Sequence, residues 1–314
     1  MKLSLTSLAV ALLLAACGGE DPPGNTVDAG PEMLDPVAAY TREGVAATLD
    51  LSCQGVATAP PTDGAATSFT LLTKDYQTGD SLTNIGINFY PDNDVPADLS
   101  CAGSCVSGTS AANSQIPATG NLGAWFAYHA PGRDCDAMPT LCSNAATTPV
   151  TTVQYNIPVP AEAETHNANV VSLATLNLIP SVLGVSRQGG TGLIAGAFLD
   201  CQEHVLSNMQ VRVYRPDGTF IVAPPAAHTS PAYRYFDGNN NPDATQKHTN
   251  EDGLFGALNM PVPTDGAEIR IEGWGNVDGE LHMISCENAR IFADGVTIMN
   301  VRPDRADGPS NCSE

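Results

Sequence analysis

Four side chains that carry oxygen atoms able to bind a metal ion stand at every second position of one short segment of the chain. They are Asp237, Asn239, Asn241 and Asp243. Alternate carboxylate and amide oxygens on a tight loop are ligands that Ca²⁺ takes in proteins. An EF-hand loop would place a glycine sixth and a glutamate twelfth, whereas this segment has Pro242 and His248 there. The segment is therefore a candidate calcium site outside the EF-hand class, and a solvated turn is the favoured interpretation.

The N-terminus has the pattern of an export signal that ends in a modifiable thiol. Lys2 precedes an apolar run from Leu8 to Ala16, and the small residues Ala15 and Ala16 stand before Cys17. The run is shorter than the ~20 residues that a membrane-spanning helix needs. The pattern resembles a bacterial lipoprotein signal, with an ordinary secretory signal as the alternative. The resemblance implies cleavage before Cys17 and a lipid anchor on the outer membrane, on its periplasmic or surface face.

Eight further cysteines lie beyond this signal. They are Cys53, Cys101, Cys105, Cys135, Cys142, Cys201, Cys286 and Cys312. An even number in an exported chain predicts disulfides, although 105 pairings are possible. Cys201 and Cys286 are the preferred pair, because each lies near the end of an expected strand in the same half of the chain. A four-thiolate zinc site built from the cysteines at 101, 105, 135 and 142 is the alternative for those residues.

The charge balance limits the classes of partner. The formal net charge is −21 at pH 7. Nucleic acid needs a basic surface, so we expect no nucleic-acid partner. Anionic lipid headgroups are disfavoured for the same reason, so the lipid chains must hold the protein at the membrane. Apart from the membrane, we expect a binding partner that is a protein or a glycan. The sequence does not identify it.

The composition favours a β-rich protein. The chain has 29 glycines and 24 prolines, which break helices and are natural in turns between short strands. We expect an all-β fold with two prealbumin-like or immunoglobulin-like β-sandwich domains joined by a short helix or linker. The expected divisions are a signal peptide (1–16), a flexible tether (17–46), a first sandwich (47–165), a helix or linker (166–189), a second sandwich (190–303) and a tail (304–314).

Two segments of the chain repeat each other. Residues 82–90 and 206–214 share the pattern Leu-[Thr/Ser]-Asn-x-x-[Ile/Val]-x-x-Tyr at an offset of 124 residues, and Asp75 and Asp200 end the strand expected before each. Both segments alternate like half-buried strands. A period this long indicates a duplicated domain.

The expected helix lies between the two copies. Ser172 is a suitable N-cap and Gly184 a suitable stop, and Leu173, Leu176 and Leu183 fall on one helical face. A buried strand is the alternative.

The second copy carries the pattern of a known family. The residues are Gly196–Asp200, Val211 and Val213, Thr249–Phe255, Leu258–Pro261 and Ile269–Gly273. They resemble the carboxypeptidase regulatory-like domain over roughly residues 190–303. The resemblance implies a prealbumin-like sandwich, with Asp252-Gly253 forming a turn that directs Phe255 into the core. It also implies a module without catalytic activity.

One enzyme class has a similar fold. Intradiol dioxygenases hold ferric iron through two tyrosines and two histidines, and Tyr233, Tyr235, His248 and His282 would be the corresponding set. Those enzymes carry a His-x-His pair that this chain lacks, so the dioxygenase is the minor alternative.

A non-catalytic, surface-anchored scaffold for structure, adhesion or ligand display is the main expectation, with no cofactor unless Ca²⁺ binds. A carbohydrate-binding module is the alternative, because exposed aromatic rings stack on sugars. The candidate rings are Trp125, Tyr128, Tyr233, Tyr235 and Trp274.

Overall fold

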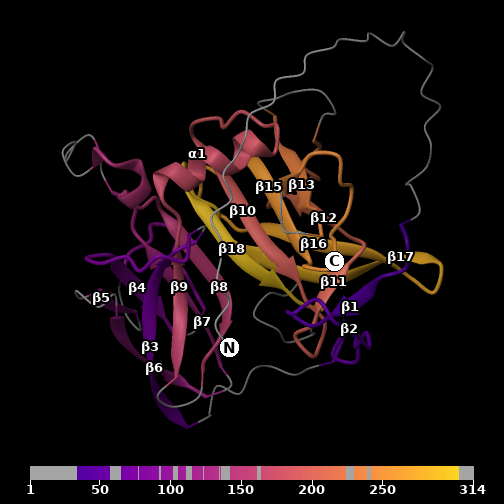
Figure 1. The fold of residues 1–314 in the computed structure, drawn as a ribbon, viewed down its shortest axis with the longest axis horizontal. Helices are drawn as coiled ribbons and strands as arrows, with labels where there is room; N and C mark the ends of the chain where they lie inside the picture. The colour runs from indigo at the N-terminus through magenta and orange to yellow at the C-terminus, as the bar shows by residue number, and fades with distance from the viewer. Residues whose placement is uncertain are drawn as a thin grey trace. The chain divides into compact units, whose positions relative to one another are not determined.

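The fold is all-β, as the sequence predicts. The computed structural model describes residues 34–56, 65–76, 78–91, 93–101, 105–110, 115–122, 124–133, 135, 142–160, 164–223, 230–238 and 242–303. Strands dominate these residues, and α1 (Leu173–Val182) is the one α-helix among them. Figure 1 shows the strands in two neighbouring groups with α1 across the top.

The first sandwich faces a three-stranded sheet against a four-stranded one. The three-stranded sheet has the order β6-β3-β9, and the four strands opposite have the order β8-β7-β4-β5. These strands are β3 (Ala66–Asp75), β4 (Gly86–Tyr90), β5 (Val106–Thr109), β6 (Gln115–Asn121), β7 (Trp125–Ala130), β8 (Thr152–Pro158) and β9 (Thr165–Val170).

The second sandwich is built in the same way. One layer has the order β14-β13-β15-β10-β18 and the other the order β12-β16-β17. These strands are β10 (Thr191–Phe198), β12 (Met209–Tyr214), β13 (Ala232–Phe236), β14 (Pro242–Asp243), β15 (Leu254–Pro261), β16 (Ile269–Val277), β17 (Glu280–Ala289) and β18 (Val296–Val301).

Strand pairing supports the duplication that the sequence indicates. β3 pairs antiparallel with β6 and parallel with β9, as β10 pairs with β15 and β18. β4, β7 and β8 pair in succession, as β12, β16 and β17 do. The repeated asparagines Asn84 and Asn208 both have positive φ, 59° and 62°. Asparagine tolerates this left-handed conformation better than most residues, which explains its presence in both copies.

The two sandwiches share one sheet. β8 of the first copy pairs in parallel with β18 of the second, from Thr152↔Val296 to Tyr155↔Met299. The result is a nine-stranded sheet that runs through both copies. The junction therefore contains backbone hydrogen bonds in addition to side-chain contacts.

The segment before the first sandwich also belongs to the second one. β1 (Ala38–Tyr40) pairs with β2 (Ala46–Ala47) and with β11 (Val205–Ser207) of the second copy. Val37 donates its N–H to the carbonyl of Asn276, and Ala39 is buried. Composition places residues 34–46 in a tether, whereas these residues lie against a sandwich, because backbone pairing and the buried side chains of Val37 and Ala39 hold the segment there.

Two strands of the first sandwich lie at the edges of its two sheets. β5 and β6 lie within residues 91–118 and just beyond, and both are edge strands. Residues 219–222 form no strand and contribute an isolated bridge between Tyr214 and Phe220.

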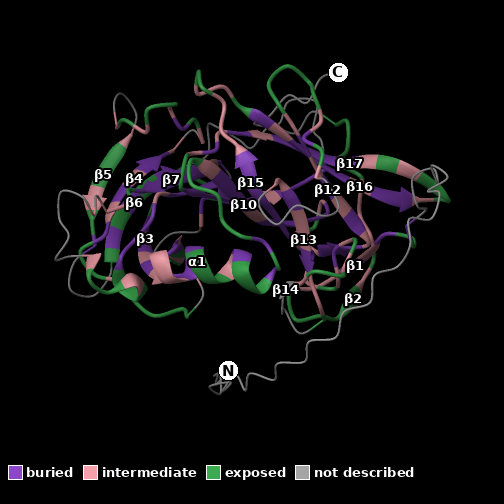
Figure 2. Cartoon of the chain, turned by 90° about the horizontal axis from the view of Figure 1, so that it is seen from above, coloured by how far each residue is buried: buried purple, intermediate pink, exposed green. Residues whose placement is uncertain are grey.

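The helix forms where the sequence predicts it. Ser172 accepts a hydrogen bond from the Thr175 N–H, and Gly184 follows the helix with φ of 69°. Leu176 and Leu183 are buried against the outer face of the nine-stranded sheet. Figure 2 shows the helix with one buried and one exposed face. Phe255 turns inward, as expected, and stacks on Phe198 with 4.7 Å between ring centroids.

The disulfides correct two expectations. The pairs are Cys53–Cys201, Cys101–Cys105 and Cys135–Cys142. The Cys201–Cys286 pairing is wrong, because the segment 34–56 folds onto the second sandwich and brings Cys53 to Cys201. The zinc alternative is wrong, because its four thiolates are used in two short-range disulfides. Cys286 is also disulfide-bonded, and Cys312 lies outside the described residues.

Candidate functional site

A buried arginine joins the two sandwiches. Arg302 follows β18 and is 1% exposed. Its Nε and Nη2 donate to the two carboxylate oxygens of Glu203, at 2.6 and 2.8 Å. Its Nη1 donates to the carbonyl of Asn156 on β8, and its guanidinium lies 4.5 Å from the centre of the Trp125 ring on β7. One side chain therefore connects a loop of the second copy to two strands of the first.

Asn156 is itself held in an unusual conformation at this junction. It is buried, with φ of 58°. Its N–H donates to Oδ1 of Asn93, and its Oδ1 accepts from Nδ2 of Asn93. The loop after β4 thereby fixes the carbonyl that Arg302 uses.

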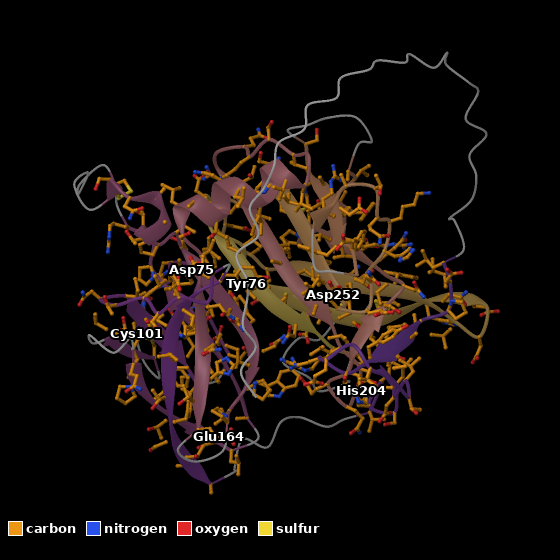
Figure 3. The ribbon with its side chains drawn as sticks, in the orientation of Figure 1. Asp75, Tyr76, Cys101, Glu164, His204 and Asp252 are labelled. Atoms are coloured by element: carbon orange, nitrogen blue, oxygen red, sulfur yellow. A yellow bond between two sulfur atoms is a disulfide. The ribbon has the colours of Figure 1, made fainter. Side chains whose placement is uncertain are left out.

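A second node fixes the segment before the first sandwich. The buried carboxylate of Asp200 accepts from the backbone N–H groups of Asp50, Gln202 and His204. Its Oδ2 also lies 3.1 Å from Nδ1 of His204, whose position Figure 3 shows. An Asp–His pair can orient an imidazole for catalysis. Here the other Asp200 contacts go to the backbone beside the Cys53–Cys201 disulfide, which favours a structural role.

An apolar cavity of about 60 Å³ lies under α1. Leu176 and Leu183 line it from the helix side, and Phe255 lines it from β15. Tyr76 enters it from the first copy (Figure 3). Burial, with Asp252 as the second cause, raises the pKa of Tyr76. The tyrosine thus acts as an uncharged anchor between the copies.

Two histidines of the first sandwich, His129 buried and His166 half-buried, are kept neutral. Neither ring nitrogen of His129 on β7 has a hydrogen-bond partner among the described residues. Burial lowers its pKa from 6.5 to about 4. Burial, with Arg42 as the second cause, also lowers the pKa of His166 to about 4. His166 packs edge-on against Phe126.

These histidines predict a loss of stability in acid. Between pH 6.5 and about 4 the unfolded chain binds a proton at His129 that the folded chain excludes, so the free energy of unfolding falls as the pH falls. The expected loss for this group is ~3 kcal/mol across that range. Chemical denaturation at a series of pH values should show a flatter dependence for His129→Leu. His282→Leu, at an exposed position, is the control and should keep the wild-type slope.

The open end of the first sandwich contains a larger cavity, about 150 Å³. It lies where the two edge strands β5 and β6 approach each other (Figure 2). Apolar side chains of Leu71, Ile87, Phe89 and Ile116 line it, and Val106 stands at its margin with 56% of its surface exposed. The cavity could not be predicted from the sequence, because β5 is short and does not alternate between buried and exposed residues.

The predicted calcium loop is only partly described. Asn239 and Asn241 lie outside the described residues. Oδ1 of Asp243 accepts hydrogen bonds from both N and Oγ1 of Thr245. Within the part of the chain that the structure describes, no group of three or more His, Cys, Asp or Glu residues is arranged to hold a metal ion. Calcium binding at Asp237–Asp243 stays a prediction.

The tyrosines of the iron hypothesis are engaged in structural contacts. The Tyr235 hydroxyl accepts from the Val211 N–H, and the Tyr233 hydroxyl accepts from the Val213 N–H and donates to the carbonyl of Ile221. Burial raises the pKa of both hydroxyls. Iron binding requires the tyrosinate form, so these contacts oppose the hypothesis.

The aromatic rings do not form an open platform. Tyr128 and Tyr235 are buried at 0% and 4% exposure, which removes them as sugar-stacking residues. Trp274 lies under the guanidinium of Arg212, at 4.2 Å from the ring centre. Trp125 lies under Arg302 in the same way. The candidate rings are thus spread over the core and two arginine-covered positions.

No protein-family model matches the chain, and no curated protein matches it. Among solved structures, the shaft pilin SpaA of Lactobacillus rhamnosus GG is similar at 11% identity and a TM-score of 0.23, over 76% of this chain and 98% of the pilin. The minor pilin GBS52 of Streptococcus agalactiae is similar at 8% identity and a TM-score of 0.23, over 76% of this chain and 96% of that pilin. These likenesses concern the fold alone.

The residues predicted to carry a membrane anchor lie outside the described part of the chain. Cys17 precedes the first described residue, so lipid attachment stays a prediction. Among the described residues, no helix is long and apolar enough to cross a bilayer.

Proposed function

We propose that the protein is a lipid-anchored, non-catalytic scaffold of the bacterial outer membrane. The supporting observation is that side chains able to take part in chemistry make structural contacts instead. The carboxylate of Asp200, the hydroxyl of Tyr235 and the guanidinium of Arg302 all make contacts that hold strands or sandwiches together. A shared sheet and three disulfides between described residues link the parts of the double sandwich, which suits a protein that carries or displays a surface.

The carbohydrate-binding alternative has less support. Sugar stacking needs aromatic faces open to solvent. Arg212 and Arg302 cover the faces of the two tryptophans that could serve. The carboxypeptidase regulatory-like resemblance of residues 190–303 agrees with a non-catalytic module, and membership of that family is part of the proposal.

The proposed lipid anchor predicts that membrane association depends on Cys17. Replacing Cys17 with serine should move the protein from the outer-membrane fraction to the soluble periplasmic or extracellular fraction, because one thiol carries the lipid attachment. Fractionation followed by immunoblotting measures the distribution. Ser4→Ala, in the same signal segment, is the control and should leave the protein in the membrane. Outer-membrane retention of the Cys17→Ser form would contradict the anchor.

The scaffold role is tested by partner capture. Cross-linking of intact cells that express the lipidated protein, followed by mass spectrometry, should recover defined protein neighbours. A glycan array probed with the soluble chain should stay negative. Specific binding on the array would favour the carbohydrate-binding alternative.

A further inference from the structure

Among the described residues, the nine-stranded sheet ends in two edge strands of different character. At one end, β14 has two residues, Pro242 and Asp243. A short strand with a proline and a charge is protected against pairing with another strand. At the other end, β5 has four residues, Val-Ser-Gly-Thr, with no charge and no proline. The sheet can therefore extend at β5.

The side chains of β5 face in two directions. Val106 and Gly108 pair with Phe89 and Ile87, whose side chains lie in the core. Val106 thus faces the interior of the sandwich, yet 56% of its surface is exposed. This exposure and the 150 Å³ cavity beside it show that no described residue covers the apolar layer at this edge.

Charge indicates which partner can approach this edge. The chain has a formal charge of −21, so two copies repel each other over most of their surfaces. Strands β4 to β8 contain no Asp, Glu, Lys or Arg. Two copies can therefore meet at this end without placing like charges opposite each other.

We propose that β5 pairs antiparallel with β5 of a second copy and makes a two-fold symmetric dimer with one continuous sheet. In the register that centres the axis on Ser107, Val106 of each copy lies opposite Gly108 of the other. The side chain of Ile116 already lies over Gly108, so the partner's valine packs against Ile116 at the margin of the cavity. Such an interface uses the same patch on both subunits, as two-fold symmetry requires.

The dimer is expected to be weak and reversible. A four-residue edge makes a small interface, at the low end of specific association. Anchoring both copies in one membrane would raise their effective concentration. The inference adds to the scaffold function without depending on the lipid, so the two can fail separately.

Sedimentation velocity on the mature chain carrying Cys17→Ser tests the dimer without a contribution from lipid. Over a series from micromolar to millimolar, the apparent mass should rise toward twice that of the monomer. Val106→Lys should abolish the rise, because an edge lysine opposes strand pairing. Val45→Lys, at a valine that is 62% exposed on the second sandwich, should behave like the wild type.

Cross-linking tests the register. Ser107→Cys should form a covalent dimer on mild oxidation, because paired residues across an antiparallel ladder have Cα atoms within disulfide range. Val45→Cys is the control, since this exposed position lies away from the proposed interface. Equal cross-linking of the two variants would overturn the proposed pairing. So would a wild type that stays monomeric throughout, even if it binds a different partner at this edge.

Discussion

Replacing Cys53 and Cys201 together with serine is expected to lower the free energy of unfolding by ~5 kcal/mol. The disulfide joins residues 148 positions apart, so it closes a loop that contains the whole first sandwich. In the chain-entropy account, the link stabilises the fold by restricting the unfolded chain, and the effect grows with loop length. Chemical denaturation of the oxidised protein, followed by tryptophan fluorescence, measures the change.

A short-range disulfide provides the matched control. Cys101 and Cys105 are 4 positions apart. The same relation gives ~2 kcal/mol for replacing both with serine. A double-serine variant at Cys53 and Cys201 that loses no more stability than this control would show that the Asp200 contacts alone hold the segment.

The local elements could be predicted because their signals are local. Ser172 and Gly184 mark the ends of α1 in the sequence, and the alternation of residues 206–214 marks β12. The repeat at an offset of 124 residues predicts two similar sandwiches before any contact is known. The prediction from the Asp252-Gly253 turn is also confirmed, since Phe255 lies in the core.

The long-range pairings could not be predicted in this way. β1 has three residues, Ala-Ala-Tyr, which show no periodicity, and its partner β11 lies about 170 residues later. The pairing of β8 with β18 depends on two edges meeting across the copies. The Cys53–Cys201 disulfide depends on the position of β1. The pairing of these two cysteines therefore could not be predicted from the sequence either.

The residues around Arg302, at the junction of the two sandwiches, could not be predicted from the sequence for a related reason. An arginine directly after an apolar strand usually lies in solvent, because charged side chains are rarely buried. Arg302 is buried only because Glu203, Asn156 and Trp125 surround it from two copies. No spacing in the sequence connects these four residues.

Removing the carboxylate at this junction is expected to destabilise the protein by ~3–5 kcal/mol. Glu203→Gln leaves the guanidinium of Arg302, which is 1% exposed, without its counter-charge. The converse change is milder, because the carboxylate of Glu203 is 41% exposed and water can solvate it. Arg302→Met keeps an apolar side chain against Trp125 and should therefore cost less than Glu203→Gln.

Two comparisons test whether the loss of stability comes from the buried charge of Arg302. One uses a double variant at the junction, and the other uses an ion pair on the surface. Adding Arg302→Met to Glu203→Gln should restore part of the lost stability, since the unpaired buried charge is then gone. Arg187→Met breaks an ion pair with Asp294 whose side chains are 30% and 50% exposed, and it should change stability by less than ~1 kcal/mol. Chemical denaturation of all four variants measures these differences. If Glu203→Gln and Arg187→Met have equal effects, the Arg302–Glu203 pair does not hold the sandwiches together, and the β8–β18 ladder carries the junction.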